Sequence, residues 1–340
     1  YGMGTAGEGQ NITHSQKKIK TEEIKRFRDR FRLPVSDEEL EKIPFLKPED
    51  DSEEMRYLHE RRKELGGYLP MRKTDVPAIE APALDIFDAM LKNSGERELS
   101  TTMVFVRMLS IMTRDKTIGK RLVPIIPDEA RTFGMEGLFR QLGIYSSSGQ
   151  LYEPEDHDKI MWYREDTRGQ ILQEGINEAG AMSDWIAAAT SYTNHGVSMI
   201  PFYIYYSMFG FQRVGDLIWA AGDMQARGFL LGGTAGRTTL NGEGLQHQDG
   251  HSLLASGGIP NCVSYDPTYA YELAVIMQDG IRRMYQEQEN VFYYITLMNE
   301  NYQHPDMPKG AEQGILRGLY LLKKGGRKKQ RVQLLGSGTI

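Results

Sequence analysis

The chain has 340 residues, of which 40% are hydrophobic, and its formal net charge at pH 7 is −5. This length accommodates two domains, or one complete domain with parts of others. The small negative charge argues against a dedicated nucleic-acid-binding protein, and no stretch approaches the roughly 18 consecutive apolar residues of a membrane span. A single cysteine, Cys262, excludes an internal disulfide and favours a reducing, cytoplasmic setting.

The first part of the chain predicts loops and short helices. Residues 1–11 are rich in glycine and are expected to form a loop, and Thr21–Arg32 carries apolar residues at helical spacing. Ser36–Glu39 has the capping-box pattern that opens a further short helix. The stretch Gly66–Pro82 holds two glycines and three prolines and is typical of a linker.

From Ser100 onward, short apolar runs alternate with helical patterns. Ser100 is the expected N-cap of one helix, and Asp266, followed by Pro267, is the expected N-cap of another that extends to about Tyr285. Alternation of this kind implies an α/β fold with a parallel sheet covered by helices on both faces. The runs expected to form strands are Leu122–Ile126, Ile200–Tyr206, Gly228–Leu231, Cys262–Tyr265 and Val291–Leu297, and Val332–Leu335 is expected to begin a further strand.

Polar and aromatic residues follow three of the predicted strands. Asp128 and Glu129 come directly after the first, Phe209 follows the second, and His247 lies in the loop after the third. Ligands of parallel sheets bind at the carboxyl ends of strands, so these residues are candidates for one site. Asp128 and Glu129 could equally be acids at a helix N-terminus, where they complement the helix dipole.

Glu178 stands immediately before the alanine-rich segment Ala179–Thr190, which predicts that its carboxylate is at least partly buried. Buried carboxylates are costly without partners and often mark functional sites; the alternative is an acid that complements a helix dipole. Tyr206 and Phe209 belong to an aromatic cluster at the end of a predicted strand. That cluster fits ordinary core packing or, together with an acid, a flat nitrogen-bearing ring.

The histidines allow more than one interpretation. His247 and His251 are four residues apart, as in some zinc sites, but the surrounding glycines argue against a regular helix and no third ligand is apparent. A loop histidine that acts as acid, base or hydrogen-bond donor is therefore favoured for His247. His14 follows the glycine-rich start and, on the residues alone, is a solvated loop histidine.

Several long blocks of the sequence resemble the first, decarboxylating component of the homodimeric, bacterial-type pyruvate dehydrogenase complex. The resemblance runs the length of the chain, and blocks of this length are highly specific. Gly175–Glu178 also resembles the Gly-Ile-x-Glu motif of transketolase-like enzymes in general. The blocks are Tyr1–Gly4, the loop around His14, Val123–Gly137, Gln170–Glu178, Ile200–Asp216 and Thr238–Gly250.

This resemblance implies a transketolase-like, thiamine diphosphate-binding fold in three parts. Residues 1–77 would end the diphosphate-binding domain and carry a mobile active-site loop. Residues 78–307 would form the pyrimidine-binding domain, and residues 308–340 would be a linker and the start of a C-terminal domain. Both ends of the chain would then be cuts within a longer protein.

The implied function is the thiamine diphosphate-dependent oxidative decarboxylation of pyruvate, followed by reductive acetylation of lipoamide on the acetyltransferase component of the complex. The implied assembly is a homodimer that meets the lipoyl domain and the core of that component. The alternatives are another 2-oxo acid dehydrogenase, a transketolase-type enzyme, or a fragment that is inactive in isolation.

The resemblance also implies roles for single residues toward the cofactor. Glu178, by its match, would bind the ring nitrogen of the cofactor's pyrimidine. Phe209 would stack on that ring, with Tyr206 nearby. Ile176 and Asp128 would be further cofactor contacts.

Other roles concern the substrate and the metal. Asp128 and Glu129 match acids of the active-site channel, and His247 matches a histidine that faces the substrate carboxylate. His14 matches a histidine on a mobile inner loop that is needed when the two-carbon unit passes to lipoamide. The Gly-Asp-Gly motif that holds the diphosphate and Mg²⁺ in the family is absent, so the metal ligands are expected outside this sequence.

Overall fold

The computed structural model of the chain describes residues 7–68, 76–127, 130–155, 157, 163–236, 244–326, 330 and 332–338. The chain divides into two units, Tyr1–Met71 and Arg72–Ile340. The boundary between them falls inside the glycine- and proline-rich stretch Gly66–Pro82.

The first unit contains short helices, and the one predicted from Ser36–Glu39 is of the 3₁₀ type. Glu39 accepts a hydrogen bond from the Ser36 amide at 3.3 Å, and a turn leads into the predicted short helix, which is a 3₁₀-helix. Pro44 disfavours helical φ/ψ for Ile43, which adopts a φ of 45° and ends the element. The elements of this unit are η1 (Asn11–Ser15), α1 (Thr21–Phe31), η2 (Leu40–Lys42) and α2 (Glu53–Glu64), and α1 forms where the apolar spacing predicts it.

The second unit is built on a six-stranded parallel sheet with the strand order β4-β1-β5-β6-β8-β7. The predicted α/β class is confirmed, and all five runs predicted as its strands form strands. Strand β4 was not predicted, because two residues are too few to show a periodic pattern. The strands are β1 (Leu122–Ile126), β4 (Leu172–Gln173), β5 (Ile200–Tyr206), β6 (Phe229–Gly233), β7 (Cys262–Tyr265) and β8 (Phe292–Thr296).

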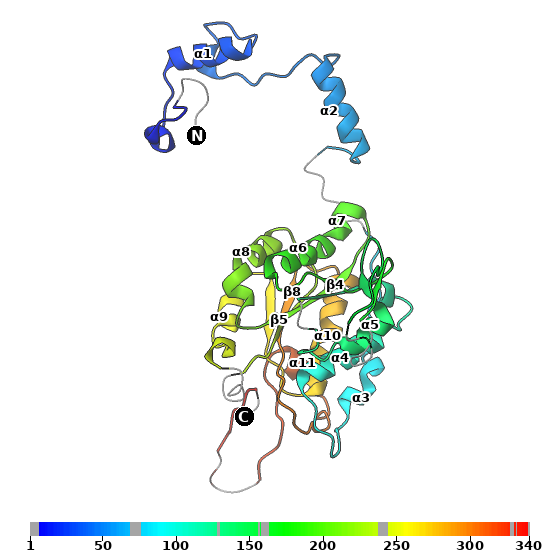
Figure 1. Cartoon of the computed structure of the whole chain (residues 1–340). Helices are drawn as coiled ribbons and strands as arrows, with labels where there is room; N and C mark the ends of the chain where they lie inside the picture. Colours follow the sequence, from blue (N-terminus) through cyan, green and yellow to red (C-terminus); the bar gives the residue numbers. More distant parts are fainter. Residues whose placement is uncertain are drawn as a thin grey trace. The chain divides into compact units, whose positions relative to one another are not determined.

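Helices cover both faces of this sheet. Figure 1 shows α6 (Glu178–Ala189) and α8 (Gly210–Asp223) on one face, and α4 (Thr101–Met112) and α10 (Ala270–Ile281) on the other. A second, small sheet pairs β2 with β3. The remaining elements are η3 (Leu84–Phe87), α3 (Asp88–Leu91), η4 (Gly119–Arg121), α5 (Glu136–Leu142), β2 (Ile144–Tyr145), β3 (Glu165–Asp166), α7 (Ser191–His195), η5 (Leu245–His247), α9 (Ser252–Ser256), η6 (Arg282–Gln286) and α11 (Glu312–Leu316).

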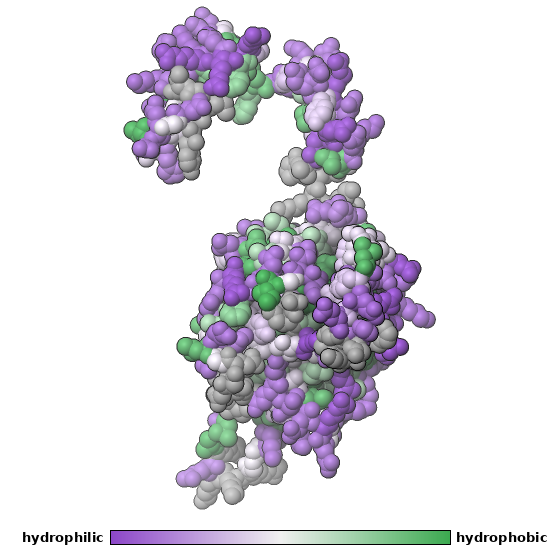
Figure 2. Space-filling model, viewed as in Figure 1, coloured by the Kyte–Doolittle hydropathy of each residue, from purple (hydrophilic) through white to green (hydrophobic). Residues whose placement is uncertain are grey.

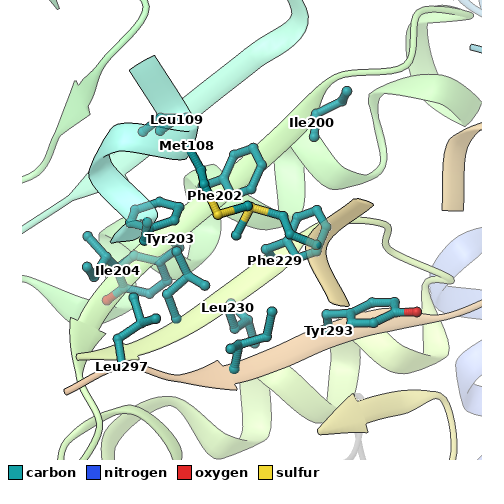
Figure 3. Close-up of a cluster of buried hydrophobic side chains, with 14 of the residues drawn as sticks. Met108, Leu109, Ile200, Phe202, Tyr203, Ile204, Phe229, Leu230, Tyr293 and Leu297 are labelled. Atoms are coloured by element: carbon teal, nitrogen blue, oxygen red, sulfur yellow. The ribbon is translucent and has the colours of Figure 1, made fainter. Parts of the chain in front are cut away.

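The core lies where helices meet strands β5 and β6. Phe202 of β5 and Phe229 of β6 stack with ring centroids 4.8 Å apart, and Met108 of α4 lies in the same cluster (Figure 3). Burying side chains of this size stabilises the fold by about 1.5–3 kcal/mol each. On α10, a Cβ atom at Gly280 would come within 2.8 Å of the Phe229 ring, so glycine is what lets this helix approach the sheet closely.

Two prolines stand within strands of the sheet, although proline lacks the amide proton that a central strand needs. Pro124 of β1 pairs with β5, while β4 on the other side pairs with Ile125 and Ile126. Pro201 of β5 pairs with β1, while the pairing of β5 with β6 begins at Phe202. Each proline therefore lies where the second neighbouring strand has not yet begun.

The helix caps test the predictions made for α4 and α10. Ser100 caps α4 as predicted, because its hydroxyl accepts a hydrogen bond from the Met103 amide at 3.1 Å. Helix α10 differs from its prediction, since it begins at Ala270 rather than at Pro267. It ends at Ile281, and the π-helical turn η6 continues it.

Asp266 does not cap α10, which corrects the prediction. Its carboxylate accepts hydrogen bonds from the hydroxyls of Thr296 and Ser337. The start of α10 is instead capped by two side chains: Glu272 accepts a hydrogen bond from the Tyr269 amide at 3.0 Å, and Nδ1 of His304 accepts one from the Ala270 amide at 3.0 Å. The His304 contact comes from a distant part of the chain and therefore leaves no local sequence pattern.

The predicted strand at Val332–Leu335 is also wrong. These residues form no strand, and Val332 and Leu334 are 85% and 89% exposed. Apolar residues form a strand when a neighbouring sheet pairs with them and buries them, and no sheet in the described part of the chain does so here.

The surface of the second unit that faces the viewer in Figure 2 is mostly hydrophilic, with hydrophobic residues scattered over it. Hydrophobic residues exposed singly are normal for folded proteins. No helix among the described residues is both long enough and apolar enough to cross a membrane.

Candidate active site

The carboxyl end of the sheet carries a pocket of about 350 Å³. Among the strands of this sheet, β4 follows β1 in the sequence and lies on one side of it, while the next, β5, lies on the other side, so the strand order reverses at β1. Such a switch point leaves a crevice where ligands bind. The pocket is lined by residues of α8 and of the segments at the ends of β1, β4, β5 and β6, namely Pro127, Ile176, Glu178, Tyr205, Tyr206, Phe209, Arg213, Gln246 and His247.

Five residues that were predicted from the sequence as site residues therefore line this pocket: Ile176, Glu178, Tyr206, Phe209 and His247. They come from three separate stretches of the chain: after β4, at and after the end of β5, and after β6. The parallel sheet brings these stretches together because its strand ends share one edge.

A glycine turn and a helix start place Glu178. Gly175 adopts a φ of +68°, a left-handed conformation that glycine reaches without steric cost. Asn177 then caps α6, because its side-chain oxygen accepts a hydrogen bond from the Gly180 amide at 3.1 Å. Glu178 is the first residue of α6 and its side chain is 16% exposed, as the predicted partial burial requires. The carboxylate thus lies both at the favourable end of a helix dipole and in the pocket wall.

Three aromatic rings form one wall of the pocket. The centroids of Tyr206 and Phe209 are 6.0 Å apart, and the His247 ring lies 4.8 Å from Tyr206 and 5.6 Å from Phe209. The planes of the rings meet at 59° to 76°, near the edge-to-face geometry that aromatic pairs prefer. All three side chains are half-buried, so part of each ring borders the open space.

Arg213, which sequence reasoning missed, connects the acid to the aromatic wall. Its guanidinium forms an ion pair with the Glu178 carboxylate and lies 4.2 Å from the centroid of the Phe209 ring. Arginine suits both contacts, because its planar guanidinium bonds to carboxylates and stacks on aromatic faces. The spacing could have revealed it, since Arg213 follows Phe209 by four residues, one turn of a helix. Val214 has non-helical dihedrals of −129° and 22°, so α8 is kinked beside Arg213.

The loop that carries His247 is anchored by Asp249, whose side chain is 6% exposed. Its carboxylate accepts hydrogen bonds from the amides of His251 and Ser252, each at 3.0 Å, and from the Ser252 hydroxyl. Burial by itself would raise the pKa of Asp249, but these hydrogen bonds hold that pKa below its usual value. The chain is thereby fixed two residues after His247.

Replacing Asp249 by Asn should lower the free energy of unfolding at pH 7 by about 1–3 kcal/mol, because hydrogen bonds to a charged acceptor contribute roughly that much. The folded pKa lies below the unfolded value of about 3.9. The contribution of the Asp249 carboxylate to the free energy of unfolding is therefore complete above about pH 4, and it is lost as the pH falls through the folded pKa. Urea unfolding from pH 7 to pH 3 checks this, with the exposed Asp223→Asn as control. A deficit that stays constant over that range would contradict the assignment.

The structure does not describe two of the predicted site residues, and it places a third in the first unit. Asp128 and Glu129 are outside the described residues, although the adjacent Pro127 lines the pocket. His14 belongs to the first unit, where it is an exposed residue of η1, whereas the pocket belongs to the second unit.

A zinc site at His247 and His251 finds no support in the described residues. There, no group of three His, Cys, Asp or Glu side chains could hold a metal ion. His251 has other contacts: its Nδ1 lies 3.5 Å from a carboxylate oxygen of Asp249, and its Nε2 lies 3.1 Å from the side-chain nitrogen of Gln212.

Comparison with known proteins identifies close relatives of the whole sequence. The chain is 63% identical to the pyruvate dehydrogenase E1 component of Cupriavidus necator over 343 residues, and 63% identical to that of Pseudomonas aeruginosa over 341 residues. It is 60% identical to the Escherichia coli pyruvate dehydrogenase E1 component over 342 residues. Each alignment covers 100% of this chain and 38% of the relative, so the chain spans well under half the length of these relatives.

Solved transketolases share the fold at low sequence identity. The transketolase of Leishmania mexicana aligns with a TM-score of 0.52 and 15% identity, covering 69% of this chain and 30% of its own. That of Pichia stipitis aligns with a TM-score of 0.55 and 13% identity, covering 91% of this chain and 42% of its own. At sequence identities this low, the similarity shows a shared fold and nothing more.

The family model described as "Pyruvate dehydrogenase E1 component middle domain" matches residues 79–305, which include the whole six-stranded sheet and its pocket. The chain belongs to this family of pyruvate dehydrogenase E1 component middle domains.

Proposed function

We propose that this chain supplies the pyrimidine-binding part of a thiamine diphosphate-dependent enzyme that oxidatively decarboxylates pyruvate. One observation carries the proposal: an acid, Glu178, and an aromatic face, Phe209, line the same pocket at the switch point of a parallel sheet. The names of the relatives, pyruvate dehydrogenase E1 component, support pyruvate as the substrate. Because the chain spans 38% of their length, the complete activity requires more chain than this.

The pocket suits one flat ring better than a whole cofactor. Its volume of about 350 Å³ is at the lower end of ligand sites. A ring stacked on Phe209 would present its edge to Glu178, where Arg213 now makes both contacts. Binding of the ring therefore requires the Arg213 guanidinium to move. The sequence has no Gly-Asp-Gly motif, so we propose that residues outside it hold the diphosphate and Mg²⁺.

The residues of the pocket have separable roles in this proposal. When bound, thiamine diphosphate supplies the carbanion-stabilising chemistry that lets carbon dioxide leave pyruvate. Glu178 holds a proton at the ring nitrogen, and Phe209 and Ile176 fix the position of the ring. His247 and Tyr206, side by side in the wall, donate hydrogen bonds on the substrate side. Asp128 and Glu129, which follow β1, are proposed as acids of the channel on the resemblance alone.

A chimeric enzyme tests this function at full length. In it, this chain replaces the matching segment of the Cupriavidus necator relative, to which it is 63% identical. The chimera should reduce an artificial electron acceptor with pyruvate, and this activity should require thiamine diphosphate and Mg²⁺. Turnover of sugar phosphates in place of pyruvate would favour the transketolase alternative. A folded chimera without activity, beside an active parent, would refute the proposal.

The chain by itself presents a different case. We propose that the 340-residue chain alone is inactive, because its pocket takes one end of the cofactor. Fluorescence titration of the isolated chain with thiamine diphosphate, with and without Mg²⁺, distinguishes two cases. In one, the chain needs further residues to bind the cofactor; in the other, the chain alone is a complete enzyme. The proposed homodimer, the lipoyl-domain partner and the reducing cytoplasmic setting belong to the full-length enzyme.

His14 is proposed to act in the transfer to lipoamide rather than in decarboxylation. Its η1 segment follows a glycine-rich stretch, which suits a loop that closes on a partner. His14→Ala in the chimera should leave decarboxylation with the artificial acceptor within about threefold of wild type, whereas losing a positioned group should slow acetyl transfer to a lipoyl domain about 10²-fold. The exposed His195→Ala serves as control. Equal losses in both assays would place His14 in the chemistry common to them.

A further inference from the structure

A second pocket, of about 210 Å³, lies in the second unit away from the candidate active site. It is enclosed by the segment after α3, by α4, by the start of α10 and by the chain around His304. Among the described residues, three cationic side chains, Lys92, Arg97 and Arg107, line it, and no carboxylate does. A concave surface with one sign of charge concentrates ions of the opposite sign.

Hydrogen bonds within the protein hold the wall of this pocket in place without a ligand. The Ser94 amide donates a hydrogen bond to the His304 carbonyl at 2.9 Å, and the His304 amide donates one to the Ser94 hydroxyl at 3.0 Å. Leu99 and Tyr302 exchange two backbone hydrogen bonds, of 3.0 and 3.2 Å. Asn93 is held by Asp306 through its amide and its side chain. Residues 93–99 are thus fixed along residues 302–306, and a preformed site loses little entropy when it binds.

The residues of the wall differ in which of their polar groups are already bonded within the protein. His304 uses both ring nitrogens inside the protein, since Nδ1 accepts from the Ala270 amide and Nε2 donates to the Leu99 carbonyl at 2.8 Å. Burial lowers the pKa of His304, in keeping with a neutral ring. Lys92 is paired with Asp88. For Arg97 and Arg107, the described residues provide no ion pair or side-chain hydrogen bond.

We propose that this pocket binds a small phosphate-type oxyanion through Arg97, Arg107 and the Ser94 hydroxyl. Guanidinium groups match the geometry of phosphate oxygens and bond to them in pairs. The Ser94 oxygen already accepts a hydrogen bond from His304, so its hydroxyl proton is available to donate. The volume is below the roughly 300–1,000 Å³ of sites for drug-sized ligands, so the ligand is a small anion such as inorganic phosphate or a small phosphate monoester.

Calorimetric titration of the 340-residue chain with inorganic phosphate, at low ionic strength and pH 7.5, tests the proposal. Wild type should bind one phosphate, and Arg107→Gln and Arg97→Gln should each weaken binding about tenfold or more, because each loses charge-assisted hydrogen bonds. Arg107→Lys should retain part of the affinity. The matched control is Arg114→Gln, which removes the same charge from an exposed residue just past the end of α4, outside the pocket.

A second readout does not depend on heat signals. Saturating phosphate should raise the midpoint of thermal unfolding of wild type and Arg114→Gln equally, and should raise that of Arg107→Gln by clearly less. Glycerol 3-phosphate in place of inorganic phosphate distinguishes a monoester from the free ion as the preferred form. The proposal is overturned if wild type binds no phosphate up to about 10 mM, a range that covers physiological ligands of weak affinity. It is also overturned if Arg114→Gln loses binding as much as Arg107→Gln, or if an acidic peptide binds there and phosphate does not.

Discussion

Replacing Glu178 by Gln in the chimera is expected to slow the decarboxylation of pyruvate about 10²–10⁴-fold, the usual cost of losing a positioned acid–base group. Glutamine keeps the shape of the side chain and the cap at Asn177, but it cannot share a proton with a ring nitrogen. The loss should therefore appear in kcat more than in KM. All partial reactions should fall together, because the proposed role precedes every one of them.

Exchange of the cofactor's reactive carbon-bound proton for deuterium gives the sharper test. It should slow in Glu178→Gln by the same order as the overall rate, whereas the exposed Asp223→Asn, an equal change of charge at the end of α8, should leave it unchanged. Normal exchange in the glutamine variant would remove Glu178 from the activation step. Its ion pair with Arg213 would then be the main reason for its position.

The sequence predicted the strands that coincide with short apolar runs. Strands β1 and β5 have the predicted bounds, because nearly every residue in them is buried and apolar. Strand β4 escaped prediction because its two residues owe their conformation to pairing with β1. The cap of α10 escaped in part for a similar reason: Asp266 fits the local pattern, but His304, brought close by the fold, accepts the Ala270 amide beside the local acceptor Glu272.

The candidate site was predictable to the extent that its residues follow strand ends. Glu178, Phe209 and His247 were nominated separately, and the parallel sheet brings them to one pocket. Arg213 was not nominated, because its importance comes from a contact with an acid 35 residues earlier in the chain. The anion pocket around Arg97 and Arg107 has no sequence pattern either, since it depends on two segments that pair across the fold.

Mixing two defective subunits is expected to restore activity to the proposed homodimer, because His14 and Glu178 of one chain are proposed to serve different active sites. His14 belongs to the first unit of the chain and Glu178 to the second. We propose that the part of the enzyme that includes the first unit completes a site with the pyrimidine-binding unit of the other subunit. A two-fold interface of this kind repeats the same contact twice, so each site takes one residue from each chain.

The test purifies, through two different tags, a dimer of the chimera in which one subunit carries His14→Ala and the other carries Glu178→Gln. With residues shared across the interface, one site inherits both lesions and the other inherits neither. Activity in the complete reaction with lipoyl domain should then rise to about half that of wild type, as expected for two independent sites related by the two-fold axis, while each mutant homodimer stays near background. If one chain supplied both residues to the same site, every site in the mixed dimer would keep one lesion. A purified mixed dimer no more active than the mutant homodimers would therefore assign His14 and Glu178 of one chain to the same site.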